Sequence, residues 1–194
     1  SYWWSTKTIE GVDFTAMPLI MNGNETIASI YEQGKLIGEI NLPLPGLHNL
    51  SNAIAAIGAC RINGIPFSLL QKSIANVTAP DRRFQYRGEW KKRFIVDDYA
   101  HHPSEIEATI SMARLIINSK KSNLPRIPKR LVIVFQPHRY SRTQKFLNDF
   151  ANELSKADLI LLAPLYSAGE KPNKEINSHS LSNLIKKKNI NIPI

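Results

Sequence analysis

Between residues 93 and 188 the sequence alternates short apolar runs with longer segments of helical periodicity. The apolar runs are RFIVDDY (93–99), LVIVF (131–135) and DLILLAPLY (158–166). The segments that follow repeat apolar residues every three or four positions, over 101–118, over 141–157 and from Ser178 onward. Short apolar strands that alternate with helices are typical of a parallel sheet covered on both faces. We therefore predict an α/β fold, a Rossmann-like domain with a mainly parallel sheet.

The first eighty residues follow a different pattern. Alternating apolar and polar residues, interrupted by the turn signals NGNE and EQGK, predict a small antiparallel set of strands over 13–20, 26–32 and 35–44. Helical spacing then predicts a helix within 45–65, which ends at Asn63-Gly64, and a second helix over 68–75. The segment NVTAPDRRF reads as a connection. We place a domain boundary near Pro80, which divides the chain into residues 1–80 and 81–194.

Charged and hydrogen-bonding residues gather where the three predicted strands of the second domain end. These ends carry DDYAHH, QPHRYSRT and PLYSAGE. In open α/β sheets, ligands bind outside the carboxyl ends of the strands. The topology therefore predicts a ligand site at this edge of the sheet.

The segment FQPHRYSRT is the most informative of these strand ends. Arg139 and Arg142 are three residues apart beside His138, close to a predicted helix start where backbone N–H groups favour anions. Arginine side chains suit carboxylates and phosphates, which they bind in a bidentate manner where geometry allows. The alternative is that both arginines pair with surface acids. We favour an anion receptor.

The neighbouring acids and histidines give a weaker signal. Asp97 and Asp98 are adjacent on a strand, so their side chains point to opposite faces and form a poor acid/base dyad. His101 and His102 are also adjacent, and neither Cys nor Glu stands at zinc-ligand spacing, so we expect no zinc site. The alternative role for the histidines is capping of the helix that begins at Pro103.

Composition narrows the class of protein. The net charge of +9 lies largely in RGEWKKR, KKSNLPRIPKR and Lys186 to Lys188, which read as solvated surface. No nucleic-acid motif with interleaved aromatics appears, and no apolar run is long enough to span a bilayer, so we expect small-molecule partners and neither nucleic acid nor membrane. The single cysteine, Cys60, and a start unlike a signal peptide favour a reducing, cytoplasmic setting.

Five motifs, in order, resemble the Mur ligase family: LPGLHNLSNAIAA, DRRF, VDDYAHHPSEIEATI, FQPHRYSRT and LYSAGEKP. The similarity runs from about Leu42 to Pro172, and DDYAHHP and FQPHRYSRT point to the alanine-adding branch. The resemblance implies the end of a central ATPase domain, with strands and two helices, followed by a Rossmann-like domain that delivers the amino acid. It implies ATP-dependent ligation of L-alanine to UDP-N-acetylmuramate through an acyl phosphate, in peptidoglycan precursor synthesis.

The resemblance also assigns roles by motif. The residues it implies for ATP are His48, Asn49, Asn52, Arg83 and Asp98. Those it implies for the alanine pocket and the nearby muramoyl carboxylate are Tyr99, His101, His138, Arg139 and Arg142. Arg139 and Arg142 would hold the amino acid's carboxylate, and His138 would stabilise charge on the intermediate, so His138 and Arg139 are the candidate catalytic residues.

The family's remaining parts are not in this sequence. Neither G-x-x-x-x-G-K-[ST] nor G-x-G-x-x-G occurs, so the loop that cradles ATP phosphates and the magnesium ligands are expected to precede residue 1. We interpret the chain as a fragment that is inactive alone, because positioning ATP needs those parts. Two rival hypotheses remain open: a sibling ligase that adds a different amino acid or peptide, and a non-catalytic anion-binding module.

Overall fold

The computed structural model describes residues 1–173 and 175–194, which form two compact units. Unit 1 holds Ser1–Asp97 and Leu115–Ile127, and unit 2 holds Asp98–Arg114 and Pro128–Ile194. A compact unit is not the same as an independently folding domain. The predicted domain boundary near Pro80 therefore stays a prediction.

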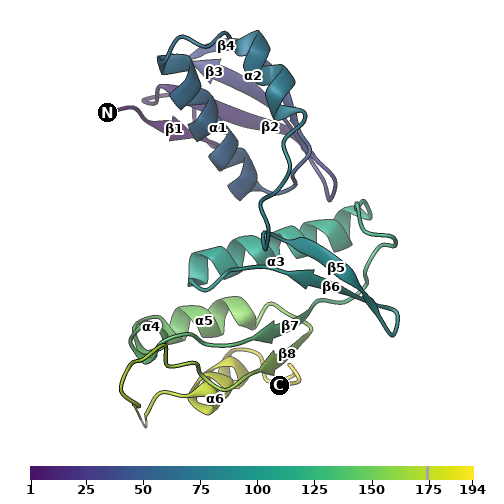
Figure 1. Ribbon diagram of the computed structural model, residues 1–194, viewed down its shortest axis with the longest axis vertical. Coiled ribbons are helices and arrows are strands. Elements are labelled where there is room, and N and C mark those ends of the chain that lie inside the picture. The colour runs from purple at the N-terminus through teal and green to yellow at the C-terminus, as the bar shows by residue number, and fades with distance from the viewer. Residues whose placement is uncertain (174) are drawn as a thin grey trace. The chain divides into compact units, whose positions relative to one another are not determined.

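Unit 1 contains a four-stranded sheet (Figure 1). Its strands, in spatial order, are β1 (Trp4–Ser5), β2 (Phe14–Met21), β3 (Thr26–Glu32) and β4 (Lys35–Leu42). The three longer strands are antiparallel, as predicted, whereas β1 runs parallel to β2. β1 was not predicted, because two residues are too few to show an alternating pattern.

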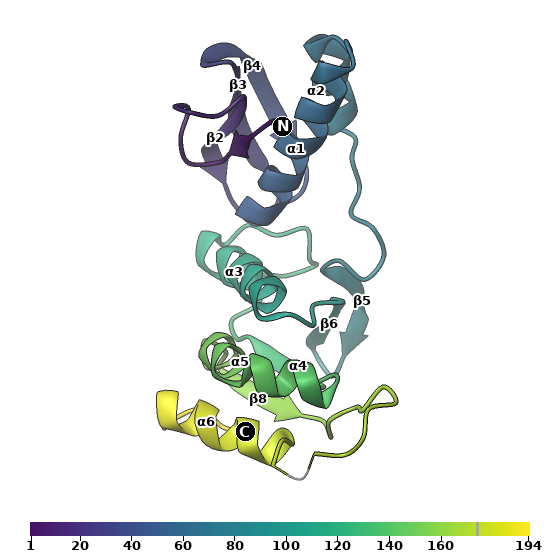
Figure 2. The same ribbon diagram turned by 90° about the vertical axis from the view of Figure 1, so that its left-hand side faces the viewer.

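Two helices, α1 (Leu47–Ile62) and α2 (Phe67–Ile74), pack against this sheet (Figures 1 and 2). Both helices were predicted, and α1 ends where expected, with Asn63 as its C-cap and Gly64 at φ 81°. Glycine is favoured there because a side chain would be strained at a positive φ. The shared core holds Phe14, Ala16, Ala28, Ile30, Ile40, Leu50, Ile54, Ile57 and Leu70.

The strand predicted over 93–99 is shorter and has a different partner from the one expected. β6 (Arg93–Asp97) pairs with β5 (Gln85–Trp90) in an antiparallel hairpin (Figure 2). Among the described residues it has no pairing with the parallel strands. The turn residues Lys91 and Lys92 both have positive φ, as the favoured two-residue hairpin turn requires. A hairpin partner two residues away closes a very short loop, so this local pairing is entropically cheap.

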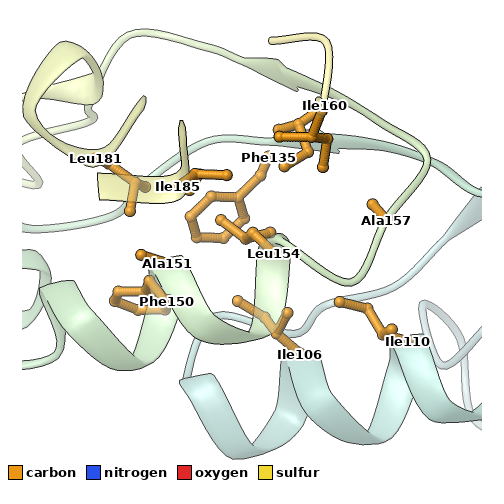
Figure 3. Close-up of a cluster of buried hydrophobic side chains, with 11 residues drawn as sticks. Ile106, Ile110, Phe135, Phe150, Ala151, Leu154, Ala157, Ile160, Leu181 and Ile185 are labelled. Carbon is orange, nitrogen blue, oxygen red and sulfur yellow. The ribbon is translucent and has the colours of Figure 1, made fainter. Parts of the chain in front are cut away.

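In unit 2 the parallel strands β7 (Val132–Phe135) and β8 (Leu159–Leu162) lie side by side. Helices α3 (Pro103–Ser119), α5 (Leu147–Leu154) and α6 (Ser178–Lys188) contribute to the core against them. Figure 3 shows this cluster, in which Phe135 and Ile160 from the strands meet Phe150 and Leu154 from α5. None of the described helices is long and apolar enough to cross a membrane.

The expectation of helices on both faces of this sheet is not met by the described residues. Val132, Val134 and Leu161 alternate with the buried strand residues and stay exposed, Val134 at 73%. Alternation along a strand sends successive side chains to opposite faces, so one face of the β7–β8 pair is buried and the other is open. The mixed α/β architecture with a parallel sheet is nevertheless as predicted.

The helix predicted over 141–157 is broken in two. α4 (Tyr140–Lys145) stops at Phe146, whose φ of −114° and ψ of 22° are not helical, and α5 resumes at Leu147. The Phe146 ring packs edge-on against His102, with ring centroids 4.6 Å apart. This contact holds the side chain at the break, which hydrophobic periodicity alone cannot reveal.

An ion pair ties α3 to the start of β8. Arg114 donates two parallel hydrogen bonds of 2.9 Å to Asp158, which also accepts from the backbone N–H of Leu131 at 2.7 Å. These hydrogen bonds, those from Arg114 first, hold the pKa of Asp158 below its ordinary value of 3.8. We therefore expect Asp158→Asn to lower the free energy of unfolding of the protein by about 1–3 kcal/mol at pH 7.

The same carboxylate makes this effect depend on pH. Because its folded-state pKa is lowered, its stabilisation is present above 3.8 and is lost as the pH falls through the folded value. Denaturant unfolding of wild type and Asp158→Asn at a series of pH values is expected to show a gap that narrows below pH 3.8. A gap that stays constant into that range would contradict the assignment.

Candidate functional site

The loops that follow β7 and β8 are joined beyond the ends of the strands. His138 and Tyr166 form an isolated parallel bridge, with the N–H of Arg139 donating to the carbonyl of Tyr166 at 2.8 Å. The N–H of Tyr166 donates in turn to the carbonyl of Pro137 at 2.9 Å. The His138 and Tyr166 rings lie 5.2 Å apart. FQPHRYSRT and LYSAGEKP thus form one structure at the carboxyl edge of the sheet, where a ligand site was predicted.

Arg139 and Arg142 both lie at the start of α4. Arg139 is the N-cap residue, with a positive φ of 72°, and Arg142 follows in the first turn. Neither guanidinium group takes part in any ion pair found among residues 1–173 and 175–194. The alternative that both arginines pair with surface acids therefore finds no support in the described residues, and two cationic groups remain for an anion.

The backbone amides at the start of α4 were expected to help bind that anion, but a side chain occupies them. Glu170 accepts hydrogen bonds from the N–H of Ser141 at 3.0 Å and from its hydroxyl at 2.6 Å. These bonds are the main reason that the pKa of Glu170 lies below its ordinary value of 4.5. Glu170 lies in the quoted motif LYSAGEKP, but nothing in the local sequence singled it out.

His138 lies in an environment that favours its neutral form. Burial is the first cause of its lowered pKa, followed by the positive charges of Arg142 and Arg139 and then by His101, whereas Glu170 opposes the shift. Its Nδ1 atom is buried and has no hydrogen-bond partner among the described residues. A neutral imidazole can donate one hydrogen bond and accept another, which suits a group that faces a polar substrate.

Tyr99 and His101 form a second group in unit 2. Their rings pack edge to face at 5.0 Å, and His101 Nδ1 lies 2.9 Å from the Tyr99 carbonyl. The effect of His101 on the pKa of His138 places both histidines in one electrostatic neighbourhood. The structure therefore gathers all five residues of the predicted alanine pocket in unit 2.

The start of α3 is capped mainly by Glu105 rather than by the histidine side chains. The Glu105 carboxylate accepts from the N–H groups of His101 at 2.9 Å and His102 at 3.1 Å. His102 Nδ1 lies 2.9 Å from the Ser104 hydroxyl and makes a longer contact of 3.4 Å with the Ser104 N–H. Of the two histidines, only His102 has a side chain that contributes to the cap of α3. The His101 side chain instead contacts Tyr99 and Glu105.

The residues predicted for ATP are divided between the units. His48, Asn49 and Asn52 lie in the first turns of α1 in unit 1, where the Asn49 side chain donates to the Pro45 carbonyl at 2.7 Å and Asn52 is exposed. Arg83 is exposed in the connection before β5. Asp98, in unit 2, accepts from the Ala100 N–H at 2.8 Å. Their role in ATP binding stays a prediction.

Asp97, the neighbour of Asp98, has a structural contact. Arg82 lies 3.2 Å from its carboxylate across the base of the hairpin. Asp97 and Asp98 therefore make different contacts, Asp97 with a side chain and Asp98 with a backbone N–H.

A shallow depression of about 370 Å³ lies elsewhere on unit 2. Its lining is largely apolar and includes Leu161, Leu162 and Ile194, with Ser178, His179 and Ser182. It contains none of the residues predicted for the site. The candidate site is therefore the edge formed by the loops after β7 and β8, and not this depression.

The fold and this edge define the class of protein. Residues 82–192 match the family model described as Mur ligase, glutamate ligase domain, so the chain belongs to the Mur ligase family, as the sequence motifs predicted. The chain is 59% identical over 192 residues to the UDP-N-acetylmuramate–L-alanine ligase of Prochlorococcus marinus strain MIT 9313, covering 99% of this chain and 39% of that protein. It is 52% identical to the ligase of the same name from Synechococcus sp. strain CC9311, covering 98% of this chain and 40% of that protein.

A solved structure supports the fold. The UDP-N-acetylmuramate-alanine ligase of Thermotoga maritima aligns with a TM-score of 0.74 and 22% identity, covering 99% of this chain and 38% of that one. The chain thus spans about two fifths of the length of the curated relatives that it matches.

Proposed function

We propose that the full-length protein carrying this chain ligates L-alanine to UDP-N-acetylmuramate at the expense of ATP. The observation that carries the proposal is the identity of 59% along almost the whole chain to a relative with that name. The grouping of Tyr99, His101, His138, Arg139 and Arg142 in unit 2 supports it independently, because these residue types suit an amino-acid carboxylate. The proposal places the protein in cytoplasmic peptidoglycan precursor synthesis, and hence in cell-wall growth and division.

In the proposed reaction an oxygen of the muramoyl carboxylate attacks the γ-phosphorus of ATP, and ADP leaves. The amine of alanine then attacks the acyl carbon, and the tetrahedral intermediate loses phosphate and a proton to give the amide. Arg139 and Arg142 hold the alanine carboxylate, which leaves the amine pointing away and free to react. Fixing both partners in this way removes much of the entropic barrier to the second step.

His138 acts in the second step. Its lowered pKa favours the neutral imidazole near pH 7, in which one nitrogen can donate a hydrogen bond to the oxygen that gains negative charge in the intermediate while the other can accept one. The buried and unpaired Nδ1 gains a partner when substrate binds. Tyr99 and His101 complete the pocket around the amino acid.

The nucleotide is assigned to other residues. His48, Asn49 and Asn52 face the adenine, Arg83 reaches a phosphate and Asp98 lies near the ribose. Side-chain amides suit adenine because they both donate and accept hydrogen bonds.

We assign no magnesium site within this chain. In residues 1–173 and 175–194 no group of three or more His, Cys, Asp or Glu side chains could hold a metal ion. In the family, magnesium offsets phosphate charge. We assign its ligands to the part of the protein outside this chain.

Amino-acid selectivity tests the proposal. We expect the full-length protein, given ATP and UDP-N-acetylmuramate, to release phosphate with L-alanine and to release it much more slowly with glycine or L-serine. Phosphate release and the mass of the product measure this. Activity with glycine or serine alone, or with a dipeptide alone, would favour a sibling ligase, and no ligation with any of them would reject the ligase proposal.

A further inference from the structure

The helix that carries both arginines starts without a capping side chain of its own. Its N-cap residue is Arg139, whose side chain makes no capping hydrogen bond. The first N–H groups of a helix have no partner within the helix, and a residue other than glycine at a φ of 72° is conformationally costly. The start of α4 therefore needs support from another segment.

Part of that support comes from the helix itself. The carbonyl of Arg139 accepts from the N–H of Thr143 at 3.1 Å and from its hydroxyl at 2.8 Å. The Thr143 side chain is fully buried. These bonds anchor the carbonyl side of Arg139, but they leave the N–H groups of the first turn without a partner.

Glu170, from the loop after β8, supplies the missing cap. One carboxylate oxygen accepts from the Ser141 N–H at 3.0 Å and the other accepts from the Ser141 hydroxyl at 2.6 Å. The backbone N–H of Tyr140 also contributes to the lowered pKa of Glu170. A carboxylate that binds the first amides of a helix is the usual N-terminal cap, but here it comes from a residue 29 positions away.

The backbone of the loop directs Glu170 to this place. Ala168 and Gly169 both have positive φ, 50° and 84°, and the N–H of Glu170 donates to the carbonyl of Ser167 at 3.1 Å. A side chain added at Gly169 would meet no atom within 4 Å, so glycine is needed there for its conformation and not for lack of space. The tight turn returns the carboxylate toward α4.

Glu170 also lies within the electrostatic reach of the site without neutralising it. The negative charge of Glu170 partly offsets the lowering of the His138 pKa. The positive charge of Arg139 helps to lower the pKa of Glu170. Glu170 forms none of the ion pairs found in the described residues, since Ser141 engages both of its oxygens. Neither Arg139 nor Arg142 is engaged in those ion pairs, so both guanidinium groups are available to bind a ligand.

We propose that Glu170 is a positioning residue that caps α4 from the neighbouring loop and so holds Arg139 and Arg142 in the orientation that binds the carboxylate of the incoming amino acid. This inference rests on the proposed function and assigns the orientation of the arginine pair to a specific contact. Loss of the cap should therefore weaken the binding of the amino acid and leave the binding of ATP and UDP-N-acetylmuramate unchanged.

The test uses steady-state kinetics of the full-length protein. Glu170→Gln keeps the size of the side chain but loses one of its two acceptor oxygens, so we expect the KM for L-alanine to rise about tenfold or more. The KM values for ATP and UDP-N-acetylmuramate are expected to stay within about twofold. Glu107→Gln, an exposed glutamate on α3, is the matched control and should leave all three values unchanged.

A double variant separates the cap from a general structural effect. Ser141→Ala removes the hydroxyl donor, and combined with Glu170→Gln it should raise the KM for alanine little beyond Glu170→Gln alone, because both changes break one contact. Three results would each overturn the proposal. The first is that the effects of Ser141→Ala and Glu170→Gln on the KM for alanine multiply in the double variant. The others are a KM for alanine that stays within twofold in Glu170→Gln, and equal rises in all three KM values.

Hydrogen exchange tests the cap without catalysis. In Glu170→Gln the amides of Tyr140 and Ser141 should exchange faster, while those of α5 should not change. If wild type fails to ligate alanine but these amides lose protection, the cap stands and the proposed function fails. If wild type is active and the amides keep their protection, the cap is wrong.

Discussion

Replacing Arg139 or Arg142 with alanine in the full-length protein is expected to lower kcat/KM for L-alanine by about 100-fold or more. Each change removes a fixed positive charge and a planar set of donors from the proposed carboxylate receptor, and truncating one partner of such a charge pair is among the costlier changes in a binding site. Neither guanidinium takes part in the ion pairs of the described residues, so the loss reports on substrate and not on a broken structural contact. ATP binding should persist.

Lys145→Ala is the matched control for these variants. Lys145 lies in the same helix, is exposed, and has its ammonium 5.1 Å from the Phe146 ring. Removing its charge should change kcat/KM for alanine by no more than about twofold. If Lys145→Ala and Arg142→Ala were equally damaging, the effect would come from the overall positive field, and the specific carboxylate receptor would be wrong.

The arginine variants also separate the ligase from the rival anion-binding module. A module that docks a polyanion through its net charge of +9 would bind more weakly as salt rises and would tolerate both arginine changes. The proposed ligase should instead lose amino-acid addition in either variant. Filter binding to a single-stranded DNA over a salt series, beside the kinetic assay, distinguishes the two.

Much of the candidate site follows from sequence because its residues sit beside predictable strands. LVIVF and DLILL are apolar enough to mark β7 and β8, and parallel strands bring their carboxyl ends to one edge. His138, Arg139 and Arg142 could therefore be placed at that edge before the fold was known. The placement needs only the order of the elements and no detail of side-chain packing.

Glu170 illustrates what local sequence does not contain. Its partner, Ser141, lies 29 residues earlier, and the two meet because the turn at Ala168 and Gly169 reverses the loop. The residues adjacent in sequence to Ser141 and Glu170 give no signal that the two side chains make contact. Capping signals are read from residues within one turn of a helix start, so a cap that comes from another loop is invisible to them.

Two errors in the predicted fold have a similar origin. The strand β5 carries Arg87, Gly88 and Glu89 and has no apolar alternation, so it was read only as surface charge, although a two-residue turn pairs it with β6. The break at Phe146 falls inside a regular apolar stripe, and it exists because the ring packs on His102 from another segment. In both cases a contact with a neighbouring segment, the adjacent hairpin strand for β5 and His102 for Phe146, overrides the pattern within the segment itself.

His138→Ala in the full-length protein is expected to lower kcat by about 100-fold or more while the KM for L-alanine changes little. Removal of one preorganised donor from a site where charge develops costs about that much in other enzymes. The separation of kcat from KM matters, because the proposed roles differ: Arg139 and Arg142 would hold the ground-state carboxylate, whereas His138 would act on the intermediate. A variant that raised KM and left kcat intact would move His138 into the binding role and remove it from the chemical step.

The pH dependence of this variant provides a second check on the same role. Burial and the nearby guanidinium groups hold the pKa of His138 below its ordinary value of 6.5, so the imidazole stays neutral until the pH falls below that value. Protonation removes the acceptor nitrogen of the neutral ring, so in wild type kcat should fall at acidic pH with an apparent pKa below 6.5, and Arg142→Lys, which keeps the positive charge, should retain that low value. Arg142→Ala should move the acidic limb toward higher pH, because it removes the largest electrostatic cause of the shift after burial. An acidic limb that did not respond to Arg142→Ala, or that survived in His138→Ala, would belong to another group and would remove the support that the titration of His138 gives to its catalytic role.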